Sequence, residues 1–267
     1  MTKRPGGESL GTVQRVIEII RFFAENGETT LKELSIALSL APSTCHRLLE
    51  LMGRDGLIEQ DRARSRYRLG SQMYRIAALV QSRRDIRVTA LPFLRSVVEA
   101  CGETCVLSLY LPSEGKIFFA EKIDSNKMLR YQLTMNMPVS VLWGASGRAV
   151  LAFLDKETVD RIYAQEGSAP ATGEALPSRR ALEKDLAAIR ERGYDVTFGQ
   201  KVAEAVGISA PIFETDGKVV GSLCVTIPKN RIIAKNRPRL GQLVSATARR
   251  LSEALGSSRD AAVKASA

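Results

Sequence analysis

The residues best suited to contact another molecule form a short polar cluster. Ser43, Thr44, His46 and Arg47 directly precede the leucine pair Leu48–Leu49. The major groove of DNA accepts one α-helix, and side chains of this kind at its start can hydrogen-bond to base edges or phosphates. A surface helix capped by Ser43, with Arg47 in solvent, is the alternative. The neighbouring elements favour DNA.

A second group of cations follows the cluster. Arg62, Arg64 and Arg66 surround the polar tip of a hairpin predicted from two β-like segments, Leu57–Gln60 and Arg66–Leu69. By itself such a tip would be a solvated turn. Beside a recognition helix, the three arginines are expected to lie along the phosphate backbone of double-stranded operator DNA.

The side chains needed for catalysis or metal binding are sparse. His46 is the only histidine, no GxSxG motif occurs, and the cysteines form no CxxC pair; they are Cys45, Cys101, Cys105 and Cys224. We read them as reduced thiols and expect no catalytic residue, metal or cofactor. An enzyme with an Asp, Glu or Lys base and an architectural DNA-binding protein without a ligand are the alternatives.

The elements around the cluster have the order of a winged helix-turn-helix. Apolar spacing predicts a helix over Thr12–Glu25, and Thr30 with Glu33 forms a capping box for a short second helix. Pro42 suits the first position of a third helix, which Gly56 ends, and the hairpin follows. We assign residues 1–70 to this DNA-binding domain.

A connector and a larger domain follow. Residues 71–84 form a predicted linker helix, whose apolar strip consists of Met73, Ile76, Ala77 and Val80 and predicts a homodimer. Residues 85–256 form a predicted α+β domain, and residues 257–267 are assigned to a flexible tail. Its helices are expected at 91–100, 145–153, 156–163, 178–192 and 237–255, and its strands at 105–111, 116–123, 129–133, 209–213 and 218–227.

Residues 129–153 are the best pocket candidate by residue type. A loop with Met135, Met137 and Trp143 leads into Gly144–Gly147 at the start of a helix. A helix N-terminus offers free amides that suit a carboxylate. Alternatively, the glycines serve only a tight turn and Trp143 fills the core.

The charge and hydropathy of the chain agree with a polyanionic partner. The 267 residues carry a formal net charge of +10. Residues 1–84 hold 14 Lys/Arg and nine Asp/Glu, a net of +5, and the same net is spread over the longer remainder. No apolar run approaches the ~18 residues of a membrane span and no signal peptide is visible, so we expect a cytoplasmic protein without a membrane partner.

The sequence resembles the IclR family of bacterial transcriptional regulators over nearly its whole length. The match runs through Pro42–Leu49, Gly56–Ile58 and Tyr67–Gly70, then Gly144–Ala149, Ile189–Tyr194 and Ser209–Phe213. The resemblance implies a winged helix-turn-helix, a linker helix used in dimerisation and a GAF-like effector-binding domain. It also implies a homodimer or dimer of dimers that binds palindromic operators as repressor or activator.

Effector contacts are carried over from the family by position. They are Met128, Val139, Ala145, Ser146, Phe198, Gly207, Cys224 and Thr226. Small-acid sensors of the family tend to have an aspartate where this chain places Phe198 and a cysteine where it places Gly207, and Leu142 replaces a common histidine. With Phe198 in the pocket, the expected effector is an aromatic or otherwise apolar carboxylic acid from a catabolic pathway, because a ring gains about 25 cal/mol per Å² buried.

Overall fold

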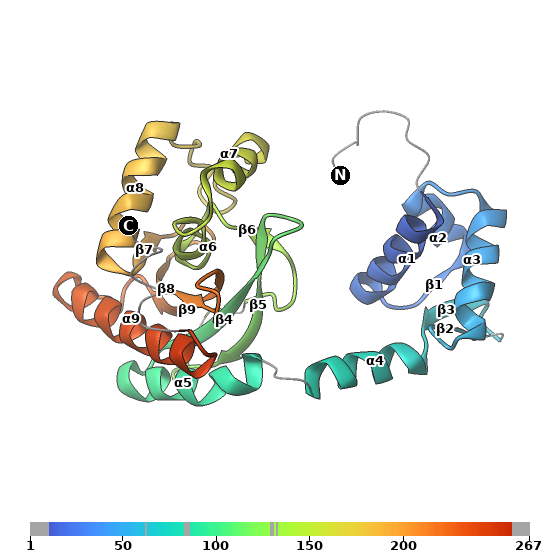
Figure 1. Ribbon diagram of the computed structural model, residues 1–267, viewed down its shortest axis with the longest axis horizontal. Helices are drawn as coiled ribbons and strands as arrows, with labels where there is room; N and C mark the ends of the chain where they lie inside the picture. Colours follow the sequence, from blue (N-terminus) through green and yellow to red (C-terminus); the bar gives the residue numbers. More distant parts are fainter. Residues whose placement is uncertain (1–10, 62, 83–85, 129–130, 132, 258–267) are drawn as a thin grey trace. The chain divides into compact units, whose positions relative to one another are not determined.

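The fold is described from a computed structural model (Figure 1). The structure describes residues 11–61, 63–82, 86–128, 131 and 133–257. The chain divides into two compact units, Met1–Asp85 and Ile86–Ala267. Arg62, residues 83–84 of the predicted linker and most of the predicted tail lie outside the described residues, as do the side chains of 80–82.

The first unit contains four helices and a small antiparallel sheet among its described residues. The elements are α1 (Thr12–Asn26), β1 (Thr29–Thr30), α2 (Leu31–Leu38), α3 (Pro42–Arg54), β2 (Ile58–Asp61), β3 (Arg66–Leu69) and α4 (Ser71–Ser82). The strand order is β1-β3-β2. The expected winged helix-turn-helix is confirmed, with β1 as an additional strand. It is held by a core that includes Ile19, Phe23, Leu34, Leu48 and Leu49.

Local signals explain where these helices begin. The Thr30 hydroxyl accepts a hydrogen bond from the Glu33 amide, and the Glu33 carboxylate accepts one from the Thr30 amide, so the predicted capping box is present. Pro42 stands at the start of α3, where its missing N–H costs nothing. Ser39, with φ 53°, turns the chain between α2 and α3.

The second unit is built on a six-stranded antiparallel sheet. Its strands are β4 (Thr104–Leu111), β5 (Lys116–Ile123), β6 (Val139–Ser140), β7 (Asp195–Phe198), β8 (Ala205–Phe213) and β9 (Val219–Pro228), in the order β6-β5-β4-β9-β8-β7. The helices are α5 (Ile86–Cys101), α6 (Ala145–Leu151), α7 (Lys156–Gln165), α8 (Arg179–Arg192) and α9 (Arg237–Ala254), preceded by the 3-10 turn η1 (Ala234–Asn236).

Strand alternation sorts the two faces of this sheet. Leu223, Val225 and Ile227 of β9 join the core that α5 and α9 cover. The alternate β9 residues, Ser222, Cys224 and Thr226, are small and polar. They lie on the face that α6 covers, where the Ser222 hydroxyl donates to the Ser146 carbonyl (2.9 Å). The sheet is therefore a middle layer between helices (Figure 1). Its face under α5 and α9 is apolar, and its face under α6 is suited to a polar cavity.

Some predicted boundaries differ from the structure. The strand expected at Leu129–Leu133 is not formed at the described positions 131 and 133. Strand β7 was not predicted, because four residues give too short a pattern to separate from the end of α8. Helix α5 begins five residues before the predicted start at Leu91 and contains Pro92 in its interior.

Candidate DNA-binding surface and effector cavity

Helix α3 presents the polar cluster to solvent. Cys45, Leu48, Leu49 and Met52 are buried on its inner side. Ser43, His46 and Arg47 are exposed on the other side, and Thr44 is half-buried. His46 Nδ1 lies 3.8 Å from a Glu50 carboxylate oxygen on the next turn, and Arg47 has no resolved ion pair within the described part of the chain. The helix thus has one face for packing and one free face.

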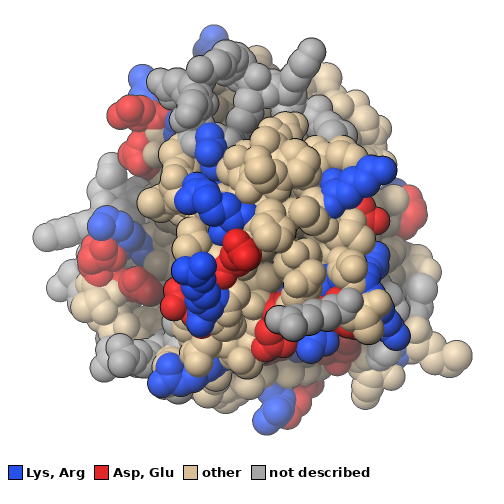
Figure 2. All heavy atoms as spheres, turned by 90° about the vertical axis from the view of Figure 1, so that its right-hand side faces the viewer, with Lys and Arg blue, Asp and Glu red and all other residues tan. Residues whose placement is uncertain are grey.

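The hairpin arginines differ in their exposure and in their ion pairs. Arg62 lies outside the described residues. The Arg64 side chain is 73% exposed, 3.9 Å from Asp61, and free to reach phosphate. The Arg66 side chain is only 32% exposed and lies 3.8 Å from both Glu28 and Glu33, so it ties β3 to the start of α2. Figure 2, viewed from the side of the first unit, shows basic and acidic side chains interspersed among larger uncharged areas.

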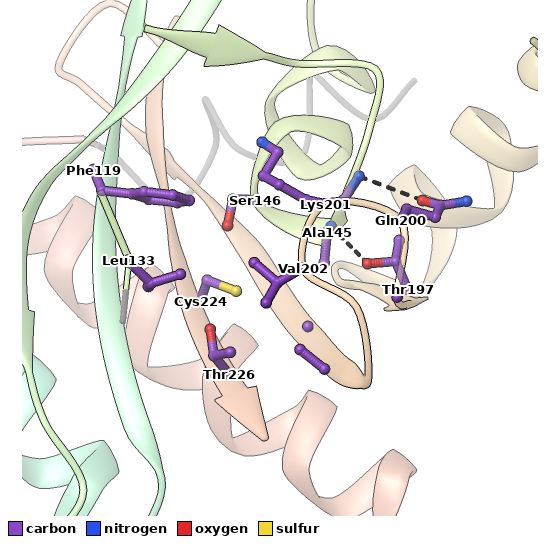
Figure 3. A pocket seen from close by; sticks show the side chains of 14 residues that line it. Phe119, Leu133, Ala145, Ser146, Thr197, Gln200, Lys201, Val202, Cys224 and Thr226 are labelled. Carbon is purple, nitrogen blue, oxygen red and sulfur yellow. Dashed lines mark hydrogen bonds between the residues drawn. The ribbon is translucent and has the colours of Figure 1, made fainter. Parts of the chain in front are cut away.

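The second unit contains a cavity between its sheet and α6. Thr197, Gly207 and Thr226 line one side of it, and they lie opposite one another across β7, β8 and β9. Ala145 and Ser146 close it from above, and Cys224 lies two residues before Thr226 on the same strand face (Figure 3). The cavity has a free volume of about 40 Å³. Hydrogen-bond register, rather than sequence proximity, brings these residues together.

Three glycines shape the backbone at and beside this wall. A Cβ on Gly207 would lie 3.2 Å from the Ala145 Cβ, a tight contact that would push α6 away from β8 by a few tenths of an ångström. A Cβ on Gly147 would lie 2.5 Å from the Val141 backbone. Gly144 has φ +80°, which a side chain would strain. The alternative that the glycines serve the turn and close packing therefore describes Gly144 and Gly147 well.

The amides at the start of α6 already have partners. The Ala145 N–H donates to Thr197 Oγ1 at 2.8 Å, and the Gly144 N–H donates to Gln200 Oε1 at 3.3 Å (Figure 3). Two donors of the predicted carboxylate site are thus used within the protein. The next two amides of α6, those of Ser146 and Gly147, have no hydrogen-bond partner among the described residues, so the carboxylate site stays a prediction for these two.

Five of the eight predicted effector contacts line the cavity and three do not. The five are Ala145, Ser146, Gly207, Cys224 and Thr226. Met128 is fully exposed, and Val139 is a half-buried residue of β6 that packs into the α7–α8 core. Phe198 is 41% exposed, and the Arg237 guanidinium stacks on its ring at 4.6 Å.

The assignment of Phe198 to the cavity is thus corrected. Successive residues of a strand point to opposite faces, so β7 directs Thr197 inward and Phe198 outward. Trp143, weighed as cavity surface, is instead buried in the core, where its indole N–H donates to the Gly167 carbonyl at 3.0 Å. The positional match to the family, which placed Phe198 in the cavity, was therefore off by one residue.

Sequence reasoning missed several lining residues. They are Phe119 and Leu133, and on the far side Thr197, Gln200, Lys201 and Val202. Strand alternation over residues 195–198 could have identified Thr197. Lys201 follows β7 in an irregular segment, and no periodic pattern points to it.

Two titratable groups in the cavity have shifted pKa values. Burial lowers the pKa of Lys201 to about 8, although the attraction of Cys224 and Glu166 opposes the effect. Burial raises the pKa of the Cys224 thiol, and hydrogen bonds from Ser146, Ser209 and Thr226 and the charge of Lys201 work against the rise. At neutral pH the cavity therefore holds a neutral thiol and an ammonium group.

Among the described residues, no group of three or more His, Cys, Asp or Glu side chains is arranged to hold a metal ion. Within the same residues, no helix has the length and apolar character that crossing a membrane requires.

A winged helix-turn-helix unit followed by an α+β unit with a cavity is the domain arrangement of a transcriptional regulator. Comparison with known families agrees with this class. The family described as bacterial transcriptional regulator IclR C-terminal matches residues 78–253, and the IclR helix-turn-helix domain matches residues 12–62. The chain belongs to the IclR family of transcriptional regulators, as the sequence motifs predicted.

Curated relatives cover nearly the full chain. The HTH-type transcriptional repressor AllR of Escherichia coli K12 is 26% identical over 245 residues, which are 91% of this chain and 90% of the relative. The transcriptional repressor IclR of the same strain is 24% identical and spans 96% and 93%. The HTH-type transcriptional regulator BhcR of Paracoccus denitrificans is 26% identical and spans 97% and 94%.

Solved structures have the same fold. A crystal structure of an IclR transcriptional regulator from Silicibacter sp. TM1040 superposes with a TM-score of 0.82 at 26% identity, covering 93% of this chain and 97% of the other. An IclR homolog from Microbacterium hydrocarbonoxydans, complexed with 4-hydroxybenzoate, gives a TM-score of 0.77 at 21% identity and covers 92% and 99%.

Proposed function

We propose that this protein is a non-enzymatic transcriptional repressor whose operator binding changes when a small organic acid enters the cavity of the second unit. The observation that carries the proposal is the combination of an exposed polar face on α3 with a partly open cavity in a separate unit of the same chain. Repression is supported by the names of the AllR and IclR relatives.

DNA contact is proposed for Ser43, Thr44, His46 and Arg47 on α3, with Arg64 on the phosphate backbone. Arg66 contributes mainly through its ion pairs with Glu28 and Glu33, which hold the hairpin against α2. Charges of both signs are mixed on this unit, so we expect a few placed side chains, rather than a uniform basic field, to determine binding.

The effector is proposed to be an acid with an apolar body. Phe119, Leu133 and Val202 supply apolar walls, and Ser146, Thr226 and Cys224 supply polar groups. Cavities that admit benzene measure about 150 Å³. A ring therefore needs more room than the free volume of about 40 Å³, so we expect lining residues to move when it binds. The relative from Microbacterium hydrocarbonoxydans is complexed with 4-hydroxybenzoate, which supports an acid of about that size as the effector.

The active species is proposed to be a homodimer, or a dimer of dimers, on a palindromic site. Helix α4 exposes Tyr74 (69%), Ile76 (44%) and Leu79 (48%), a set of large apolar side chains that a second copy would cover. Of the strip predicted from sequence, Ala77 is exposed, Met73 is half-buried, and the Val80 side chain lies outside the described residues. Two-fold symmetry would match a palindromic operator.

Calorimetry and gel shifts together test the proposal. A genomic fragment selected by the protein serves as the operator, and pyruvate, glyoxylate, benzoate and 4-hydroxybenzoate are titrated in turn. At least one acid should bind the protein and change its affinity for the fragment. Turnover of an acid would favour an enzyme instead, and operator binding that none of the four acids changes would contradict the acid-sensing role.

A further inference from the structure

Lys201 differs from every other residue that lines the cavity. Within the described part of the chain, it is the only charged side chain in the lining. Its aliphatic stem crosses Gly144, whose missing Cβ would lie 3.1 Å from the Lys201 Cβ. The residue keeps some exposed surface, but protein atoms enclose its side chain, and the stem reaches over the top of the cavity toward Phe119 (Figure 3).

The ammonium group has neutral contacts only. Nζ donates to the Ser140 carbonyl oxygen at 2.9 Å and lies 5.7 Å from the centre of the Phe119 ring. No carboxylate of the described residues lies within the 4.0 Å ion-pair distance of Nζ. Glu166, the acidic group that acts on it, accepts a hydrogen bond from the Ser140 hydroxyl, and Cys224 carries a neutral thiol.

An enclosed cation without an anionic partner is unfavourable in an empty cavity. Removing an ammonium group from water costs several kcal/mol unless a counter-charge compensates it. The depressed pKa of Lys201 expresses this cost, since burial is its leading cause. An anion that enters the cavity would supply the missing charge, which the neutral amides of the first turn of α6 do not provide, and two of those amides, Gly144 and Ala145, already donate to Gln200 and Thr197.

We propose that Lys201 is the specificity-determining counter-ion of the effector: the acid group of the ligand forms an ion pair with its ammonium group, which leaves the Ser140 carbonyl. This inference rests on the proposed acid-sensing function and names the residue that recognises the acid.

The test compares an acid with its neutral amide. The tightest-binding acid of the four-member panel and its amide, for example benzoate and benzamide, are titrated by calorimetry into the full-length wild type, Lys201→Met and Lys201→Arg. Lys218→Met serves as the matched control, because Lys218 is 82% exposed in the turn between β8 and β9. The titrations are repeated from pH 7 to 9.5.

We expect the wild type to prefer the acid at least tenfold and Lys201→Met to bind acid and amide alike, with part of the preference kept in Lys201→Arg. Acid affinity of the wild type should fall by up to tenfold per pH unit above about pH 8, as the ammonium group loses its proton, and should not do so in Lys201→Met.

Each other outcome is decisive. A Lys201→Met protein that keeps the acid preference overturns the role of Lys201 while the acid-sensing function stands. A wild type that binds the acid and the amide equally, or binds no acid of the panel, overturns both. Loss of amide binding together with acid binding in Lys201→Met would show that the residue only maintains the cavity, and would overturn the counter-ion role.

Discussion

The hydrogen bond between Thr197 and the start of α6 should hold the roof of the cavity in place. Thr197 Oγ1 accepts from the Ala145 N–H at 2.8 Å, and both residues are buried. Thr197→Val keeps the shape of the side chain but removes the acceptor. The Ala145 amide is then left buried without a partner, because Gln200 is engaged with the neighbouring Gly144 amide.

A buried donor that loses its acceptor costs about 1–3 kcal/mol. In a domain of this size each kcal/mol lowers the melting temperature by roughly 2–4 °C, so the transition of the second unit should fall by about 2–12 °C. If the start of α6 opens locally, without unfolding of the whole unit, the same free energy corresponds to roughly 5- to 150-fold faster amide hydrogen exchange there. Acid binding should weaken as well, since Thr197 and Ala145 both line the cavity.

The assay combines calorimetric melting with hydrogen-exchange mass spectrometry of peptides covering residues 141–150. Thr197→Ser is the matched control: it keeps the acceptor and loses one methyl group, worth about 0.8 kcal/mol. Faster exchange should therefore appear in the valine variant and not in the serine variant. A Thr197→Val protein with wild-type exchange at residues 144–146 would refute the idea that this bond fixes α6.

Three further predictions concern DNA, assembly and the fold of the sensor unit. Arg47→Ala should weaken operator binding by about 1–3 kcal/mol with little effect on random DNA. Arg64→Ala should weaken binding to both DNAs and flatten the salt dependence of the affinity. If Arg47→Ala binds the operator with wild-type affinity in gel shifts, Arg47 is not a contact residue. Light scattering at micromolar concentration should give a dimer for the wild type and a monomer for Ile76→Glu. A wild type that is monomeric both in solution and on DNA would rule out the dimer. Arg148→Met should lower the free energy of unfolding of the second unit by about 1.5–3 kcal/mol, because the 2.8 Å ion pair of Arg148 with Asp195 is almost wholly buried while Arg192 remains as a second partner of Asp195. A thermal transition unchanged from wild type would contradict this.

The sequence determined the first unit almost completely. Its helices are fixed by local signals, such as the Thr30–Glu33 capping box and Pro42 at the start of α3, and its exposed polar cluster follows from the period of 3.6 residues. Such signals act within a few residues, so a single sequence contains them in full. The family motifs likewise predicted the α+β unit and five of the residues that line its cavity.

The chemistry of the cavity depends on contacts between distant segments of the chain. Whether Thr197 or Phe198 faces inward depends on the pairing of β7 with β8, and a shift of one residue exchanges the two faces. The donors of Gly144 and Ala145 are occupied by side chains more than 50 residues away, and Lys201 reaches the cavity from an irregular segment. These contacts depend on how distant segments pack, and residue spacing along the chain carries no information about that.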